Sequence, residues 1–184
     1  TTLTVGDSGD TVTFTSGANL SVDGTIKLDG NYPTGTENVA LGNTALDSVQ
    51  SGGNYNVAIG SSSLTTLTTG DNNTAVGFES LKVNTANNNT AIGWCSMVAN
   101  TTGASNTAIG LTSLDANTTG GDNVAVGVAA LSANTTGDNN TAVGHRALIA
   151  ATTANNNNAL GRDAACSVTT GLQNIAIGNC ALST

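Results

Sequence analysis

Apolar and polar positions recur with a fixed spacing along most of this chain. The motif Asn-x-Ala-aliphatic-Gly occurs nine times, and the steps between its glycines are 18, 17 and 16 residues and then 17 throughout. Internal repetition at a short fixed period predicts a stacked array rather than a globule with one central core. Seventeen residues are too few for a helical hairpin. We therefore predict an all-β fold, a parallel β-solenoid of about nine coils, each with two short strands and two turns. The motif glycines are Gly42, Gly60, Gly77, Gly93, Gly110, Gly127, Gly144, Gly161 and Gly178.

Each position of the repeat suggests a role. The aliphatic residue before the glycine and the Leu found four residues after it in most copies are expected to fill the coil. The invariant Ala, two residues before the glycine, leaves room for a close neighbour, which we expect to be another chain. Glycines at the motif and at a Thr-Thr corner are expected to supply positive φ angles. The Asn that opens each motif is expected to form a ladder of amides bonded between coils. This structural ladder includes Asn73, Asn89, Asn106, Asn123 and Asn140.

The first 36 residues follow a different pattern. Short segments alternate apolar with polar residues, as in Thr25-Ile-Lys-Leu28, and glycines separate them. This pattern is typical of short strands joined by tight turns. We therefore divide the chain into a short β-rich segment, residues 1–36, and a solenoid array, residues 37–184.

One column of the repeat varies where its neighbours are uniform. The residue directly after each motif glycine is apolar in four consecutive copies and polar on either side of them. We expect this variable column to pack against a sister chain, with an exposed stripe that stacks on sugar rings or on another partner as the alternative. The candidate contact or recognition residues are Phe78, Trp94, Leu111, Val128, His145 and Arg162.

Composition narrows the classes of function. The net charge is −8, with 9% charged and 3% aromatic residues, so nucleic-acid binding is not expected. No apolar run is long enough to span a membrane, and no membrane insertion is expected. Three cysteines at irregular positions give no disulfide framework. A small core per coil favours association of chains, which adds buried area.

The sequence offers little for catalysis. The single histidine, His145, stands in the variable column and is expected to be a surface residue. Arg146 and Asp163 share a repeat position one coil apart and are expected to form a surface ion pair. Asp7-Ser-Gly-Asp10 could bind calcium, although Asp in a tight turn usually caps the turn. We expect no enzyme activity, no resident metal and no cofactor.

The array resembles a known architecture. Asn73-Thr-Ala-Val-Gly77, Asn106-Thr-Ala-Ile-Gly110 and Asn140-Thr-Ala-Val-Gly144 resemble the head repeats of trimeric autotransporter adhesins, over roughly residues 37 to 182. That resemblance implies left-handed parallel β-rolls assembled as homotrimers, with a longer corner here. The opening, Leu3-Thr-Val-Gly-Asp-Ser-Gly-Asp10 through Thr25-Ile-Lys-Leu-Asp-Gly30, looks like segments of tail-fibre proteins from marine bacteriophages.

These observations lead to three hypotheses of function. The first is a rigid homotrimeric attachment fibre, in a phage tail fibre on the virion or in an extracellular surface appendage, that presents a surface to a cell-surface glycan or receptor. The second is a bacterial trimeric adhesin head. The third is an ice-binding solenoid, suggested by a column of threonines. Its members are Thr69, Thr102, Thr119, Thr136, Thr153 and Thr170.

Overall fold

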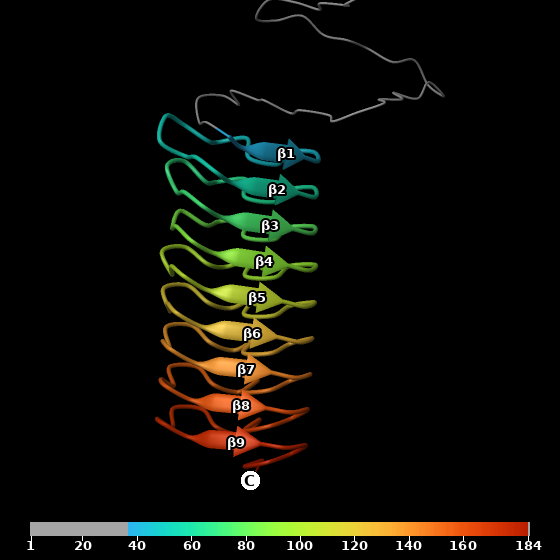
Figure 1. The fold of residues 1–184 in the computed structure, drawn as a ribbon, viewed down its shortest axis with the longest axis vertical. Helices are drawn as coiled ribbons and strands as arrows, with labels where there is room; N and C mark the ends of the chain where they lie inside the picture. Colours follow the sequence, from blue (N-terminus) through green and yellow to red (C-terminus); the bar gives the residue numbers. More distant parts are fainter. Residues whose placement is uncertain (1–36, 184) are drawn as a thin grey trace, which may run out of the picture.

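The fold is a single parallel β-solenoid. A computed structural model describes residues 37–183, and the β-rich segment expected in residues 1–36 lies outside the described residues, as does the Asp7–Asp10 turn. Within residues 37–183 the chain forms nine strands of three residues each, one per repeat, in a nine-stranded sheet whose spatial order is the sequence order (Figure 1). The strands are β1 (Val39–Leu41), β2 (Val57–Ile59), β3 (Thr74–Val76), β4 (Thr90–Ile92), β5 (Thr107–Ile109), β6 (Val124–Val126), β7 (Thr141–Val143), β8 (Asn158–Leu160) and β9 (Ile175–Ile177).

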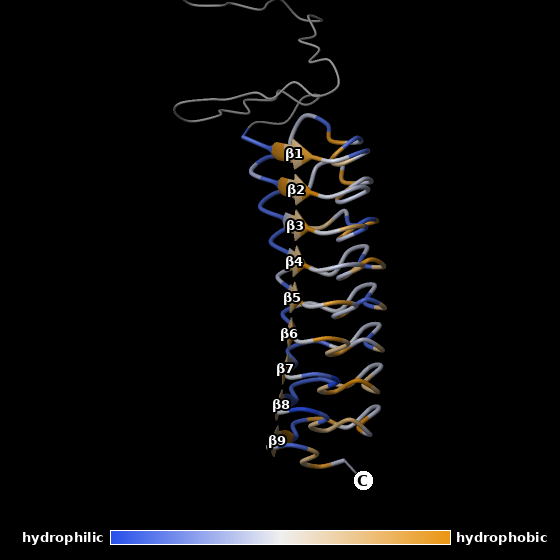
Figure 2. Ribbon diagram, turned by 90° about the vertical axis from the view of Figure 1, so that its right-hand side faces the viewer, coloured by the Kyte–Doolittle hydropathy of each residue, from blue (hydrophilic) through white to orange (hydrophobic). Residues whose placement is uncertain are grey.

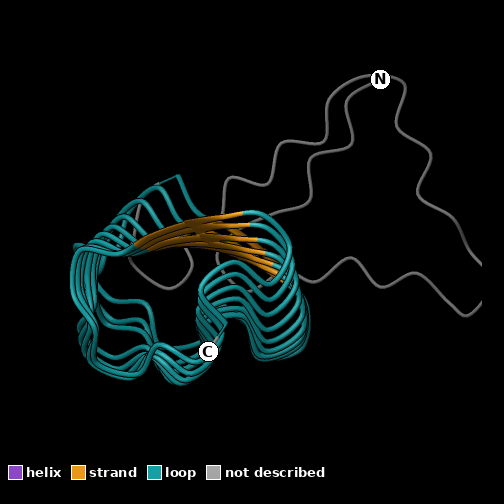
Figure 3. Ribbon diagram, turned by 90° about the horizontal axis from the view of Figure 1, so that it is seen from below, coloured by secondary structure: helices purple, strands orange, loops and turns teal. Residues whose placement is uncertain are grey.

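The repeat spacing sets the register of the sheet. All neighbouring strands are parallel, and equivalent positions of the motif pair directly, as Ala108 does with Ala125. The 18- and 16-residue repeats keep this register, because Ala40 still pairs with Ala58 and Ala75 with Ala91. Viewed along the axis, successive coils therefore superimpose, with the strands on one side and turns around the rest (Figure 3). The one-residue changes in length are absorbed in the turns.

Each coil contains one strand, not the two that were expected. After the motif glycine the chain adopts positive φ at alternate residues, for example 49° at Thr112 and 53° at Leu114. Such residues cannot continue an extended strand. Backbone hydrogen bonds between coils hold this part of the chain instead, as from Leu114 N to Ala130 O (3.0 Å) and from Thr118 N to Thr135 O (2.9 Å).

The inside and outside of the strand are opposite to the expectation. The Ala column points into the coil and is almost fully buried, with Ala108 at 0% exposure. The aliphatic residue before the glycine points outward, as Ile109 does at 38%. Ala is required because the interior is narrow and already holds the buried Leu column, represented in this coil by Leu114. The small residue therefore makes room for the chain's own leucine, not for a neighbouring chain.

The motif glycine is fixed by two constraints. Gly110 has φ of 138°, and a Cβ built on it would lie 2.5 Å from the carbonyl oxygen of Gly127 in the next coil. An L-residue is strained at such a φ, and the contact would be a clash. The corner glycines differ from the prediction, because Gly70, Gly103, Gly120, Gly137 and Gly171 are absent from the positive-φ residues, and only Gly52 in the first corner has a positive φ, of 112°. Gly120 is needed for close approach alone, since its Cβ would meet the oxygen of Gly137.

Candidate functional site

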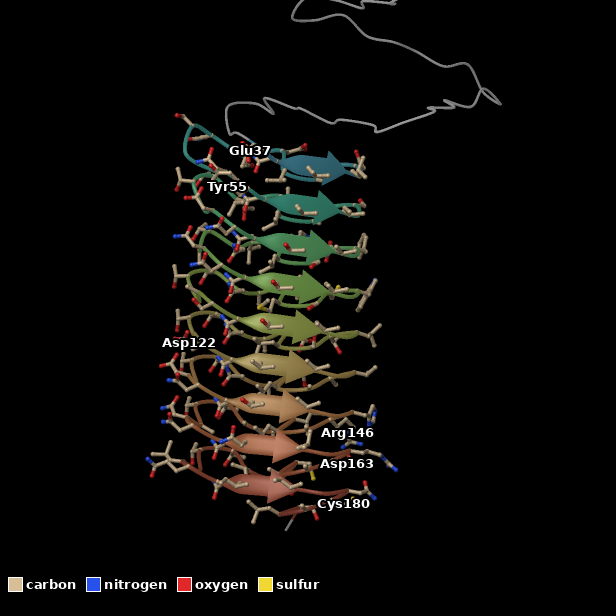
Figure 4. The ribbon with its side chains drawn as sticks, in the orientation of Figure 1. Glu37, Tyr55, Asp122, Arg146, Asp163 and Cys180 are labelled. Carbon is tan, nitrogen blue, oxygen red and sulfur yellow. The ribbon has the colours of Figure 1, made fainter. Side chains whose placement is uncertain are left out.

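The candidate site is the outward surface of the sheet together with the turn that follows it. We name the turn after each strand the C-side turn and the corner before each strand the N-side corner. They lie at opposite ends of the strand row, where Figure 4 labels Arg146, Asp163 and Cys180 on the C-side turn and Asp122 and Tyr55 on the N-side corner. Three stacked surfaces therefore run the length of the solenoid.

The outer face of the sheet carries a continuous aliphatic column. One Leu, Ile or Val projects outward from every strand, and none is fully buried. Exposure is 47% for Leu41, 39% for Ile92 and 51% for Leu160. In Figure 2 the strands stack along one edge of the solenoid, with hydrophobic colouring on several of them. This outer aliphatic column consists of Leu41, Ile59, Val76, Ile92, Ile109, Val126, Val143, Leu160 and Ile177.

The variable column begins the C-side turn, two residues beyond the aliphatic column. Phe78, Trp94, Leu111 and Val128 are 44%, 51%, 47% and 42% exposed. The rings of Phe78 and Trp94 stack across two coils, with centroids 6.2 Å apart and planes at 15°. These four side chains extend the apolar surface sideways over β3 to β6. An exposed apolar area of this kind is a candidate interaction surface.

In the coils of β7 and β8, the C-side turn carries charged residues in place of apolar ones. His145 and Arg162 are exposed, and for His145 this is the surface position that was expected. The predicted ion pair between Arg146 and Asp163 is present, with Nε and Oδ1 3.4 Å apart. Arg162 joins it, with its Nε 3.0 Å from Asp163 Oδ2. Two guanidinium groups thus share one carboxylate, which leaves a local positive charge on this turn.

The Asn column lies inside the coil and is bonded between coils. Asn106 is fully buried, and its Oδ1 accepts from the backbone N–H of Asn123 at 3.0 Å. Its amide Nδ2 donates to Gly120 O at 2.8 Å. The same contact from backbone N–H to Oδ1 joins Asn73 to Asn89, Asn89 to Asn106, and Asn123 to Asn140. This is the ladder arrangement that the repeat predicts, and it is structural because no solvent reaches it.

Sequence reasoning missed a second buried ladder. Asn100 Nδ2 donates to Asn84 Oδ1 (2.7 Å), Asn117 to Asn100 (2.7 Å) and Asn134 to Asn117 (2.8 Å). The signal was available, since Asn stands seven residues after the motif glycine in four successive repeats. A further set of contacts lies at the N-side corner, where Asp138 Oδ1 accepts from the backbone N–H of Gly121 at 2.7 Å.

The described residues offer no cluster of metal ligands and no activated thiol. Within residues 37–183 no group of three or more His, Cys, Asp or Glu could hold a metal ion. Cys95, Cys166 and Cys180 are free thiols. Burial, followed by the negative charge of Glu79, raises the pKa of the Cys95 thiol, which therefore stays protonated and is a poor nucleophile. No helix that could cross a membrane occurs in this part of the chain.

Comparisons with protein-family models, with curated proteins and with solved structures found no match to this chain.

Proposed function

We propose that this protein is the rigid shaft of an attachment fibre, assembled as a homotrimer through the outer face of its sheet. The observation that carries the proposal is the outer aliphatic column, which presents one partly or fully exposed Leu, Ile or Val on every strand from β1 to β9. Monomeric soluble proteins rarely expose a contiguous apolar surface of this length. Covering half-exposed aliphatic side chains stabilises by roughly 1 kcal/mol each, so nine coils together provide a substantial driving force.

The number of chains comes from the resemblance of the motif to trimeric autotransporter heads. A three-fold axis parallel to the solenoid would let three outer faces meet along their whole length. Such an assembly hides the aliphatic columns and leaves the turns exposed. The buried interior, with its two Asn ladders, makes each chain stiff, which suits a shaft that holds a receptor-binding surface away from a virion or a cell.

The experiment is a measurement of oligomeric mass in solution, by light scattering or sedimentation equilibrium. Three chains of 18.0 kDa give about 54 kDa (3 × 18.0). Ile109→Asp, in the middle of the outer aliphatic column, is expected to reduce the trimer fraction. Thr66→Asp is the matched control, because Thr66 is exposed, lies seven residues beyond the end of β2 and belongs to neither the outer aliphatic column nor the N-side corner. Its change should leave the mass unaltered. A wild-type protein that remains an 18.0 kDa folded monomer would refute the proposal.

The threonine column supports a second candidate function, ice binding. All six of its members are exposed, and five of them, from Thr102 to Thr170, stand on successive coils. The adjacent threonines bond their hydroxyls to the backbone of the next coil, as Thr118 Oγ1 does to Thr135 O at 2.9 Å. A single exposed column is a narrow surface for a lattice of ice, so the fibre is preferred. Thermal hysteresis of wild type and of Thr136→Val tests the alternative.

A bacterial adhesin head would have the same trimeric shaft and differ in where it is attached. Binding of the purified trimer to bacterial cells, compared with binding to host extracellular glycans, distinguishes the two settings.

A further inference from the structure

The charged ends of the strand row point to the way in which neighbouring copies meet. We propose that the C-side turn of one copy contacts the N-side corner of the next, with Arg146 facing Asp138 of the neighbouring copy. This inference rests on the proposed homotrimer and specifies its geometry. The occupant of the positively charged turn is thus a second copy of this chain.

The first step is geometric. Suppose that three chains surround one axis parallel to the solenoid, each with the outer face of its sheet turned toward that axis. The strands of each chain then run perpendicular to the line that joins the axis to the chain. One end of each row then approaches the opposite end of the next row. Figures 3 and 4 place the C-side turn and the N-side corner at those two ends. In such a cyclic trimer, each contact joins two different surfaces of the chain. This is a heterologous interface, and the three-fold rotation closes it into a ring.

The second step is register. A rotation about an axis parallel to the solenoid keeps every coil at its own height. Asp138 precedes β7 by three residues and Arg146 follows it by three, so the two residues stand at opposite ends of one coil. They are too far apart to pair within a chain, whereas the rotation brings Arg146 of one copy to the height of Asp138 of the next.

The third step is charge. Residues 37–183 contain three basic side chains other than histidine, of which Lys82 pairs with Glu79 at 2.7 Å. Arg146 and Arg162 share Asp163, and their side chains are 50% and 67% exposed. On the N-side corner the acidic residues are Glu37, Asp71, Asp122 and Asp138, and none takes part in an ion pair of the described residues. Only Asp138 stands at the height of β7, where the positive turn begins.

The apolar part of the C-side turn fits the same arrangement. At β4 the exposed Trp94 would reach the neighbouring N-side corner near Asn88, whose side chain is exposed. An indole offers a broad apolar face and one N–H donor, and both can be used against an amide-rich corner. Contacts at β3 to β6 would therefore be apolar and amide contacts, and the contact at β7 would be ionic.

Cysteine cross-linking tests the contact directly. In a background where Cys95, Cys166 and Cys180 are replaced by Ser, the double variant Asp138→Cys/Arg146→Cys should form a covalent trimer on oxidation. Its matched control is Asp71→Cys/Arg146→Cys, because Asp71 lies on the same corner but four coils away, at β3. That control should remain monomeric on a non-reducing denaturing gel.

The outcomes separate this inference from the proposed function. A trimer by mass that gives no covalent product with the first pair overturns the contact and leaves the fibre proposal intact. A folded monomer by mass overturns both. Covalent product with the control pair and not with the first overturns the register.

A second measurement avoids dependence on folding of the cysteine-free background. Asp138→Asn and Arg146→Gln should each weaken the trimer by about two- to fivefold in its dissociation constant, as exposed ion pairs do. The double variant should raise the dissociation constant by less than the product of the two single fold-changes, because both single variants lose the same contact. For the control pair, Asp71→Asn with Arg146→Gln, the fold-change of the double variant should equal the product of the two single fold-changes. A multiplicative result for Asp138 with Arg146 would contradict the contact.

Discussion

At the scale of single residues, the repeat is held by positions where only one residue type satisfies the local geometry. The motif glycines combine a positive φ with close approach of the next coil. The side chains of buried asparagines such as Asn106 bond to backbone N–H and C=O groups that have no backbone partner in the turns. In contrast, residues with positive φ that are not glycine, such as Leu114, tolerate the strain because their side chains fill the core. Substitutions at these positions should therefore have effects of very different size.

The two constraints on the motif glycine can be separated by substitution. Gly178 has φ of 123°, but a Cβ there would meet only Ala181 Cβ at 3.9 Å, since no coil of the described residues follows it. Gly178→Ala should therefore cost only the backbone strain, about 1–3 kcal/mol. Gly110→Ala adds the clash with Gly127 and should cost more than ~4 kcal/mol or prevent folding. Urea unfolding measures both, and equal losses would show that close approach contributes nothing.

Asp115 should give the protein a measurable pH dependence. Burial raises the pKa of its carboxyl above the ordinary value of 3.8, against two hydrogen bonds from the backbone that lower it, and its Oδ1 is buried without a partner. The folded state therefore holds this proton more tightly than the unfolded state. The contribution of Asp115 to stability is most favourable below 3.8 and is lost as pH rises through the raised value.

The substitution Asp115→Asn removes the charge and keeps an acceptor oxygen. We expect it to raise the free energy of unfolding at neutral pH and to lose that advantage below the ordinary pKa of Asp. Urea unfolding at a series of pH values checks this, with Asp122→Asn, on the exposed corner, as control. A difference between wild type and Asp115→Asn that does not change with pH would contradict the assignment.

At the scale of the element, the unit of stability is a column rather than a strand. Three-residue strands provide few hydrogen bonds each, and the remaining bonds between coils come from turns and from the two Asn ladders. Each coil is therefore stabilised by its neighbours, as in other repeat proteins.

Removal of one rung of the ladder should destabilise the chain. Asn106→Ala leaves Asn123 N–H and Gly120 O without their partners in a buried site, which should cost about 2–4 kcal/mol. Replacing Asn106 and Asn123 together should cost less than twice as much, since they share a bond. Asn158→Ala, at an exposed strand position, is the control and should be nearly neutral. An effect of Asn106→Ala no larger than the control would show that the ladder is not structural.

Enlarging the Ala column should damage the fold of the chain itself. Ala108 faces the interior beside the Leu column, so Ala108→Leu overpacks the coil and should cost about 3 kcal/mol or more. Ile109→Leu, at the next position on the outer face, should cost less than about 1 kcal/mol. Circular dichroism during thermal unfolding compares the two, and a fully stable Ala108→Leu protein would contradict the inward orientation.

At the scale of the whole molecule, the solenoid has an apolar outer face and two different ends to its strand row. In the proposed assembly the outer aliphatic column would form the contact surface, and the charges on the C-side turn and the N-side corner would select one arrangement of the copies. The function proposed for this solenoid therefore depends on assembly of its chains.

Substitution of Trp94 tests whether the variable column lies between chains or forms a free recognition surface. Its side chain is 51% exposed in the single chain and stacks beside Phe78. If it lies between copies, Trp94→Ala should destabilise the trimer by about 3 kcal/mol, as loss of an aromatic interface anchor does. If it faces solvent, the melting temperature should stay nearly unchanged and binding to cell-surface glycans should weaken. We expect the first outcome, measured by calorimetry of the assembled protein.

The sequence by itself determined the architecture. A fixed period of 17 residues and nine motif glycines were sufficient to predict a parallel β-solenoid, and the invariant Asn predicted a buried ladder of amides. Both conclusions follow from periodicity, because equivalent residues of successive coils must stack. The ion pair between Arg146 and Asp163 followed from the same rule.

Only the tertiary structure decided which side of the strand is inside. Alternation places Ala108 and Ile109 on opposite faces but does not say which face is buried, and hydrophobicity alone favours the larger residue. The structure buries the Ala, because the turn after each strand folds Leu114 and its equivalents into the same narrow interior. That fold of the turn depends on positive φ angles at Thr112 and Leu114, residue types that do not signal such a conformation. The outward orientation of the aliphatic column is a consequence of that packing.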